Sequence, residues 1–458
     1  MSIYKNFRDT ATVEEYSGGL MGISDFLLAN SSELMKDKKV VDEMQEWGRI
    51  LERSFRVKKN ELLLGSTTDK YEDIVVKKFN GDVVGTAIIA NKGDGKTQLG
   101  KWLYIDQFPR RWDRYLFIVD PKGDYLCLDF PQEVPACLKT LEKVGLKPMQ
   151  YKPYYCSPQF ANIFGARGKE FSFTYRCIDG LENKPLKIEV LRELLNIDVR
   201  ADSATYSLLN DLMAQGIPIH FDALIDRLRE LSQERKEIMG SHQESGKIRG
   251  LFQSLYNQGI LTDDPSRAIA FPNMLKKHKM MVFQYPLYGS DELAPSSYVK
   301  MVLSELLADR KRYVKTQEGQ EEGVLDKKIT VLIDEADAVV PKKKFTPARM
   351  AVQRLFTKER QSGFDVTLIT QNPHLVDPIT ITQSDWLITS RVRNKAIFGL
   401  LRERGFDEHL LNMVATKLKH DRQKKPVEWL LHDTSDSKTF FPFPPLTRMI
   451  TENVRQKA

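Results

Sequence analysis

A short run of small and polar residues, residues 90–97 (ANKGDGKT), constrains this chain more than any other feature. Gly93 and Gly95 let the backbone turn sharply and approach a ligand closely. The run follows an apolar, β-branched segment, residues 82–90, and precedes residues 97–103, whose apolar positions recur at helical spacing. A strand, a glycine-rich loop and a helix N-terminus in this order are typical of a phosphate-binding P-loop.

The residue types of the loop predict ATP and Mg²⁺ as its ligands. Lys96 is placed to reach the β- and γ-phosphates, and the Thr97 hydroxyl is placed to bind Mg²⁺. Ala90 stands where glycine is commonest, which is a tolerated small-residue variant. The predicted nucleotide-binding residues are Ala90, Asn91, Lys92, Gly93, Asp94, Gly95, Lys96, Thr97 and Gln98.

A hydrophobic strand that ends in two carboxylates supplies the second half of the predicted site. Residues 328–333 (KITVLI) lead into Asp334 and Glu335. Asp334 is placed to hold Mg²⁺ through water, and Glu335 is placed to orient and polarise the attacking water. A single acidic pair at a strand end is often only solvated, but together with the P-loop it predicts ATP hydrolysis.

A third strand, residues 365–371, ends in Gln371, beside which the γ-phosphate would lie. Gln371 is a candidate γ-phosphate sensor, although a buried glutamine at a strand end also serves structural hydrogen bonding. The preceding segment, residues 347–362, is expected to be a helix that carries Arg354, Lys358 and Arg360.

The order of these segments resembles that of a known superfamily. After the P-loop come residues 119–124 (VDPKGD), 333–336 (IDEA), 358–363 (KERQSG) and 370–373 (TQNP). The series resembles the FtsK/HerA superfamily of DNA-pumping ATPases, which includes chromosome translocases, conjugative coupling ATPases and viral genome-packaging ATPases. The resemblance covers scattered blocks between about residues 75 and 445.

This resemblance implies an α/β P-loop NTPase fold of the RecA-like ASCE type, a sheet flanked by helices with a helical insertion. It implies that Arg360 reaches the γ-phosphate of a neighbouring subunit and that Gln371 is the sensor. The implied assembly is a homo-oligomer, a hexameric ring that moves double-stranded DNA. The resemblance is compatible with a capsid, a nuclease or a membrane channel as a further partner. It is also compatible with a viral or plasmid origin. Lys122 has no assigned role.

The charge of the chain permits a nucleic acid partner. The 458 residues include 69 basic and 62 acidic ones, for a net charge of +7. Basic clusters at residues 391–395 and 417–425 are ordinarily solvated surface. The cluster Lys342, Lys343 and Lys344 is the exception, because it follows the Asp334 strand and in a ring could face DNA in a central channel.

The remaining composition favours an intracellular protein. Cys127, Cys137, Cys156 and Cys177 lack the spacing of a zinc site, and a reducing compartment is the simplest inference. Neither a signal peptide nor a long apolar run is evident, so a cytoplasmic location is expected.

Breaks in pattern predict four parts of the chain. They are an N-terminal helical leader at residues 1–60, a first part of the ATPase core at 61–187, a mainly helical insertion at 188–270, and a second part of the core with the tail at 271–458. Asn80–Gly81 lies between two β-rich runs and predicts a hairpin. The aromatic, proline-rich end, residues 440–445, is expected to pack across its own domain.

The predicted nucleotide-binding residues are also compatible with two other functions. The chain could be an ATP-switched binding or assembly protein of a mobile element or virus that does not pump DNA. It could also be an ATPase that moves protein substrates through a secretion channel. Stimulation of ATP turnover by DNA distinguishes the DNA motor from both alternatives.

Overall fold

The structure is a computed structural model that divides into two compact units, residues 1–56 and 57–458. It describes residues 57, 60–71, 73–158, 169–171, 173–174, 211, 221–234, 242–257, 261–262, 269–284, 293–315, 323–343, 346–392, 394–419, 427–433 and 436–448. The predicted N-terminal leader, Lys344 and Cys177 lie outside these residues. The four-part division of the chain therefore stays a prediction.

In the described part of the chain, twelve strands form one sheet in the order β2-β1-β14-β13-β12-β3-β11-β10-β4-β9-β5-β6. The strands from β12 to β6 run parallel, and the strands from β13 to β2 pair antiparallel. The strands are β1 (Glu61–Ser66), β2 (Ile74–Lys78), β3 (Gly85–Ile89), β4 (Tyr115–Asp120), β5 (Tyr154–Pro158), β6 (Lys169–Phe171), β9 (Met280–Gln284), β10 (Ile329–Ile333), β11 (Phe364–Thr370), β12 (Trp386–Thr389), β13 (Trp429–His432) and β14 (Ser437–Pro442). A short separate pair joins β7 (Phe173–Thr174) to β8 (Leu261–Thr262).

Helices connect these strands. The α-helices are α4 (Lys96–Gly100), α5 (Phe108–Trp112), α6 (Pro135–Lys143), α9 (Phe221–Glu234), α11 (His242–Asn257), α12 (Phe271–His278), α13 (Leu293–Lys315), α14 (Ala336–Val339), α15 (Pro347–Thr357), α16 (Pro378–Thr382), α17 (Lys395–Glu403) and α18 (Glu408–Asn412). Shorter 3-10 or π-helical segments are η2 (Lys101–Ile105), η4 (Arg360–Ser362), η5 (Pro373–Leu375) and η6 (Met413–Lys417).

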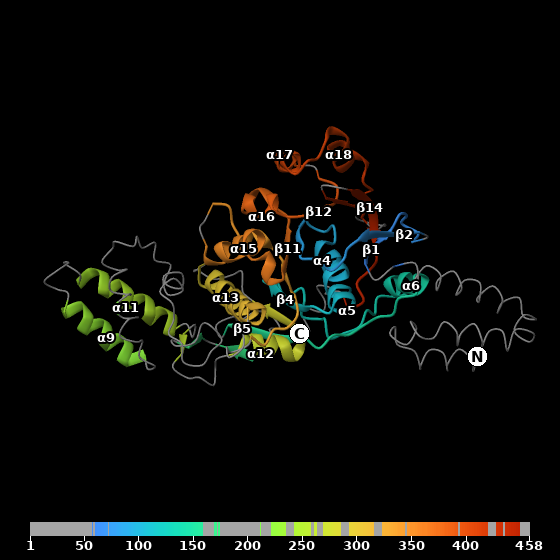
Figure 1. Ribbon diagram of the computed structural model, residues 1–458. Coiled ribbons are helices and arrows are strands. Elements are labelled where there is room, and N and C mark those ends of the chain that lie inside the picture. The colour runs from blue at the N-terminus through green and yellow to red at the C-terminus, as the bar shows by residue number, and fades with distance from the viewer. Residues whose placement is uncertain are drawn as a thin grey trace, which may run out of the picture. The chain divides into compact units, whose positions relative to one another are not determined.

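Helices cover both faces of the parallel sheet, which explains its continuous apolar strands. Successive side chains of a strand point to opposite faces. In β4, Phe117 and Val119 join the core that includes residues of α12, α13 and α15, whereas Leu116 and Ile118 join the core that includes residues of α4, η2 and α5. Figure 1 shows α13 and α15 on one side of β4 and β11, with α4 and α5 on the other. The predicted α/β P-loop architecture is confirmed.

The aromatic end of the chain packs as expected. Strand β14 pairs with β13 and with β1, and the side chains of Phe440, Phe441 and Phe443 are buried. Beyond it, the carbonyl of Leu446 accepts hydrogen bonds from the amides of Gln132 (2.9 Å) and Met149 (2.9 Å). These bonds attach the end of the chain to the segment that follows β4.

The hairpin predicted at Asn80–Gly81 is wrong. Strand β2 pairs with β1, and β3 pairs in parallel with β11 and β12. Gly81 does adopt a positive φ of 78°, but its carbonyl accepts hydrogen bonds from the side chains of Arg114 (2.6 Å) and Lys328 (2.6 Å). Those bonds hold the turn to the amino edge of the sheet, so the chain leaves β2 without folding back on it.

In the predicted insertion, the described helices α9 and α11 contact each other. Leu224 and Leu228 of α9 are buried, as are Ile248 and Phe252 of α11. Throughout the described residues, no helix has both the length and the hydrophobicity that crossing a bilayer demands.

Candidate nucleotide-binding and hydrolysis site

Four parallel strands bring the predicted site residues to one edge of the sheet. Strand β3 pairs with β11, β11 with β10, and β10 with β4, in registers that place Ile89, Thr370, Ile333 and Val119 near the ends of their strands. The carboxyl ends of parallel strands lie at the same edge, which is where α/β proteins bind nucleotides. The P-loop, the acidic pair and Gln371 all follow directly from these strand ends.

The loop after β3 has the backbone that the sequence predicts. Gly93 and Gly95 adopt φ values of 87° and 86°, which residues with a Cβ rarely adopt. Helix α4 begins at Lys96, directly after Gly95, so its first backbone N–H groups are available to an anion. Lys92 and Gln98, both predicted to bind nucleotide, have exposed side chains.

Asp94 stabilises the P-loop through hydrogen bonds. Its buried carboxylate accepts hydrogen bonds from the Ser390 hydroxyl (2.7 Å) and from the backbone N–H of Asn91 (3.2 Å). The Asn91 side chain in turn donates to the carbonyl of Arg391 (2.8 Å). Asp94 thus connects the loop to the segment after β12, a role that no sequence motif indicated.

Lys96 is buried at the centre of this loop. Its Nζ donates to the carbonyl of Asn91 at 3.4 Å, within the curve of the P-loop. Burial lowers the pKa of Lys96, and the neighbouring carboxylates of Asp334 and Glu335 act in the opposite direction. A lysine held among these groups is suited to meet phosphate oxygens.

Thr97 and Asp334 meet, as a shared metal site requires. The Thr97 hydroxyl donates to Asp334 Oδ2 at 2.9 Å, and the Tyr125 hydroxyl reaches the same oxygen at 3.3 Å. Burial, together with the nearby carboxylates of Asp124 and Glu335, raises the pKa of Asp334 to about 6. A hydroxyl and a carboxylate are hard oxygen ligands of the kind Mg²⁺ prefers, so this pair fits the ion.

Glu335 lies beside this pair in an uncommon backbone conformation. Its φ is 47°, in the left-handed region that few non-glycine residues adopt. One carboxylate oxygen, Oε1, accepts a hydrogen bond from Gln371 Nε2 at 2.9 Å and forms an ion pair with Lys122 Nζ. Gln371 therefore lies at the acidic pair, and the unassigned Lys122 lies there too.

Arg360 lies at the opposite edge of the sheet, and the helix expected to carry it is shorter than predicted. Helix α15 ends at Thr357, and Arg360 begins η4, directly before β11. Its guanidinium donates to Asp385 Oδ1 (2.8 Å) and to the carbonyls of Gln383 (2.7 Å) and Phe356 (2.9 Å). Arg360 thus forms an ion pair with Asp385.

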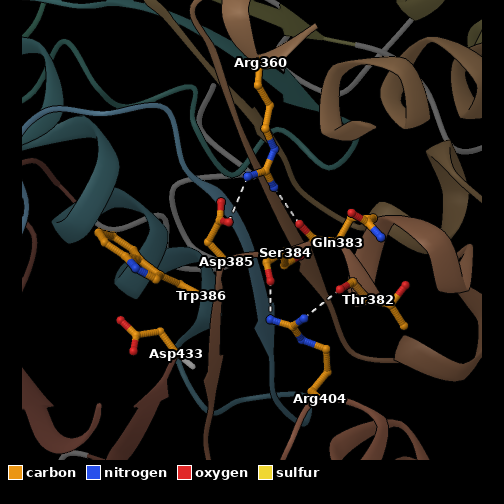
Figure 2. A pocket seen from close by; sticks show the side chains of 8 residues that line it. All are labelled: Arg360, Thr382, Gln383, Ser384, Asp385, Trp386, Arg404 and Asp433. Atoms are coloured by element: carbon orange, nitrogen blue, oxygen red, sulfur yellow. Dashed lines mark hydrogen bonds and ion pairs between the residues drawn. The ribbon is translucent and has the colours of Figure 1, made fainter. Parts of the chain in front are cut away.

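Arg360 and a second arginine line one pocket at this amino edge. Figure 2 shows Arg360 and Arg404 approaching the segment Thr382–Asp385 from two sides. Arg404 donates to the carbonyls of Thr382 (2.6 Å) and Ser384. The Arg360 side chain is 36% exposed.

Two of the three lysines of the predicted DNA-binding cluster are described, and both are exposed. Lys342 and Lys343 follow α14, and the Lys342 amide donates to the carbonyl of Leu375 at 2.6 Å. The guanidinium of Arg349 donates to the Lys342 carbonyl (2.9 Å) and to the Asp377 carboxylate (2.7 Å). The backbone at Lys342 is therefore held by hydrogen bonds, while the side chains of Lys342 and Lys343 face solvent.

Comparison with known proteins agrees with the fold. No protein-family model matches the sequence, and no curated protein matches it. Among solved structures, VirB4 of Thermoanaerobacter pseudethanolicus is similar over 87% of this chain and 99% of its own, with 14% identity and a TM-score of 0.53. This likeness shows that the fold is the α/β P-loop NTPase fold that VirB4 also has.

Two further structures are similar at lower TM-scores. The bacterial conjugative coupling protein TrwBdeltaN70 matches over 87% of this chain and 90% of its own, with 14% identity and a TM-score of 0.43. The genome packaging NTPase B204 of Sulfolobus turreted icosahedral virus 2 matches over 79% of this chain and 98% of its own, with 11% identity and a TM-score of 0.36.

Proposed function

We propose that this protein hydrolyses ATP and uses the energy to move double-stranded DNA. The observation that carries the enzymatic part is the meeting of Thr97, from the P-loop, with Asp334, from a distant part of the chain, at 2.9 Å and directly beside Glu335. An accidental pair of acids at a strand end would not be expected to meet the one hydroxyl that a P-loop offers to Mg²⁺.

Each residue of the site has a chemical task in this proposal. The amides of residues 92–97 and the ammonium of Lys96 bind the triphosphate, and Thr97 and Asp334 hold Mg²⁺, which when bound neutralises phosphate charge. Glu335 accepts a hydrogen bond from the attacking water and aligns it with the γ-phosphate. Gln371, which contacts Glu335, would report on the γ-phosphate.

Arg360 would complete the site of a neighbouring subunit. It lies at the amino edge of β11, whereas Gln371 follows the carboxyl edge of the same strand. An arginine on the far edge of the sheet, with a partly exposed side chain, is suited to head-to-tail assembly, in which each subunit supplies a guanidinium to the next. A hexameric ring is the form of assembly that we propose.

Double-stranded DNA is the proposed substrate of the motor. The motif series from the P-loop to residues 370–373 and the FtsK/HerA-type fold both support this choice. Lys342 and Lys343 are exposed and follow the acidic pair, and hydrogen bonds hold the backbone at Lys342, so their side chains are suited to bind DNA backbone phosphates in a ring channel.

An ATP turnover assay with three proteins tests this proposal. The unaltered protein should release phosphate from ATP, and added duplex DNA should raise the rate. Glu335→Gln should retain ATP binding but lose turnover by about 10² or more, because the amide cannot act as a base. Lys96→Ala should lose ATP binding as well. Turnover by Glu335→Gln close to that of the unaltered protein would remove the catalytic assignment.

DNA dependence decides between the motor and its alternatives. A turnover rate that duplex DNA leaves unchanged would favour an ATP-switched assembly protein or a protein-secretion ATPase. In that case the assignment of the nucleotide site would hold, and the assignment of DNA as the substrate would be wrong.

A further inference from the structure

The segment that follows β4, residues 120–125 (DPKGDY), is held in one conformation by a buried carboxylate. Asp120 is fully buried and accepts hydrogen bonds from the backbone N–H groups of Gly123 (2.8 Å), Asp124 (3.0 Å) and Tyr125 (3.0 Å). Gly123 supplies the positive φ of 76° that this tight turn needs. Lys122 lies within this turn, so its Cα has a defined place at the edge of the sheet.

The same segment contacts both acids of the proposed hydrolysis site. Strands β4 and β10 are parallel neighbours with Val119 opposite Ile333, so the residues after each strand emerge side by side. Tyr125 reaches the Asp334 carboxylate at 3.3 Å, and Lys122 forms an ion pair with Glu335. One preformed turn therefore meets the metal-binding acid and the water-polarising acid together.

The contacts of Glu335 are distributed unevenly over its carboxylate. Lys122 Nζ and Gln371 Nε2 both reach Oε1, and among the described residues no side chain donates a hydrogen bond to Oε2. The Glu335 side chain is 13% exposed and that of Lys122 is 33% exposed, so solvent reaches the pair. A carboxylate held by one oxygen leaves the other in a fixed direction to accept from water.

We propose that Lys122 is a positioning residue, which holds Glu335 by Oε1 so that Oε2 faces the attacking water. This inference rests on the proposed role of Glu335 in ATP hydrolysis. It explains why a lysine in the turn after β4 matters to a site built on β3 and β10.

The test compares Lys122→Met with Lys122→Arg in steady-state ATP turnover. Lys122→Met should lower kcat by about 10- to 100-fold, the usual effect of removing a group that orients a reacting one. The dissociation constant of a fluorescent ATP analogue should change by less than about twofold, since Lys122 acts through Glu335. Lys122→Arg keeps the charge and should recover most of the lost rate. Lys139→Met, at an exposed position of α6, is the matched control.

A double variant separates positioning from a general structural defect. In a Glu335→Gln background, adding Lys122→Met should not lower the residual rate further, because the group that it orients is already lost. Additive losses would overturn the proposal, as would full activity of Lys122→Met. A matching loss of nucleotide affinity would overturn it by making Lys122 a phosphate ligand. A rise in turnover would overturn it by making the ion pair a brake on Glu335.

The outcome is distinguishable from failure of the proposed function. Turnover by the unaltered protein and its loss in Glu335→Gln test the ATPase without Lys122. If both hold and Lys122→Met is fully active, only the positioning role fails. Intact binding of the ATP analogue shows that each variant is folded.

Discussion

The position of Arg360 predicts that activity can be restored by mixing two inactive variants. Strand β11 has seven residues and separates Arg360, before its first residue, from Gln371, after its last. At about 3.3 Å per residue the strand is about 20 Å long, which is far beyond the length of an arginine side chain. Arg360 therefore cannot reach the γ-phosphate bound by its own P-loop. It acts on a neighbouring subunit or has no catalytic role.

The expected rates follow from this geometry. Arg360→Ala alone should lose about 10³ in rate, the effect of an arginine that stabilises phosphoryl transfer in trans. When equal amounts of Arg360→Ala and Glu335→Gln mix at random, about a quarter of head-to-tail interfaces combine an intact Glu335 with a neighbour's intact Arg360. Turnover per site should then rise to about a quarter of the unaltered rate, well above that of either variant alone.

Two control variants test whether the loss of turnover in Arg360→Ala has a merely structural cause. Asp385→Asn removes the charge partner of Arg360 and should leave turnover within about threefold, because an exposed ion pair contributes under about 1 kcal/mol. Arg402→Ala breaks a comparable surface pair with Glu408 and should have no effect. If mixed rings demonstrably form and turnover stays at the level of the separate variants, the inter-subunit mechanism is wrong.

Three further predictions concern stability, pH and DNA. Arg114→Met leaves the fully buried Asp365 carboxylate without its ion-pair partner and should lower the free energy of unfolding by about 3–5 kcal/mol in guanidinium titrations; a loss under about 1 kcal/mol would contradict this. Because the pKa of Asp334 is raised to about 6, Mg²⁺ must displace a proton below that pH. Mg²⁺-dependent nucleotide affinity should fall about tenfold per pH unit below 6 and stay level above it, and Asp334→Asn should lack this pH dependence; equal affinity of the unaltered protein at pH 5 and pH 8 would refute the assignment. Changing all of Lys342–Lys344 to Ala should weaken duplex DNA binding equally across sequences and reduce its salt slope by about 0.9 for each DNA phosphate that the lysines no longer neutralise; an unchanged slope would return the cluster to ordinary surface.

Local sequence patterns predicted the strand, loop and helix segments that carry the candidate site residues. The P-loop lies between β3 and α4, and Asp334 and Glu335 follow β10, as predicted. Such features can be predicted because the periodicity of apolar residues and the placement of glycines depend on a few neighbouring residues. Helix α15 ends at Thr357, earlier than the predicted helix over residues 347–362. Its C-terminal carbonyls of Arg354 and Phe356 bond to the Lys358 amide and the Arg360 side chain, which turns the chain toward β11.

Contacts between segments could not be predicted, because they depend on the order of strands in the sheet. The ion pair of Lys122 with Glu335 exists because β4 and β10 are neighbours, and no feature of either segment alone requires that order. The bond from Ser390 to Asp94 depends likewise on β12 lying beside β3. The hairpin prediction failed for the same reason, because β2 pairs with β1 and not with β3.

A triplex-displacement assay tests the central claim, ATP-driven movement along double-stranded DNA, most directly. A labelled third strand bound to a duplex is released only when a motor passes through its site. The unaltered protein with ATP should release it, and Glu335→Gln or an ATP analogue that resists hydrolysis should not. ATP hydrolysis at full rate on the same duplex, with the third strand left in place, would contradict the claim.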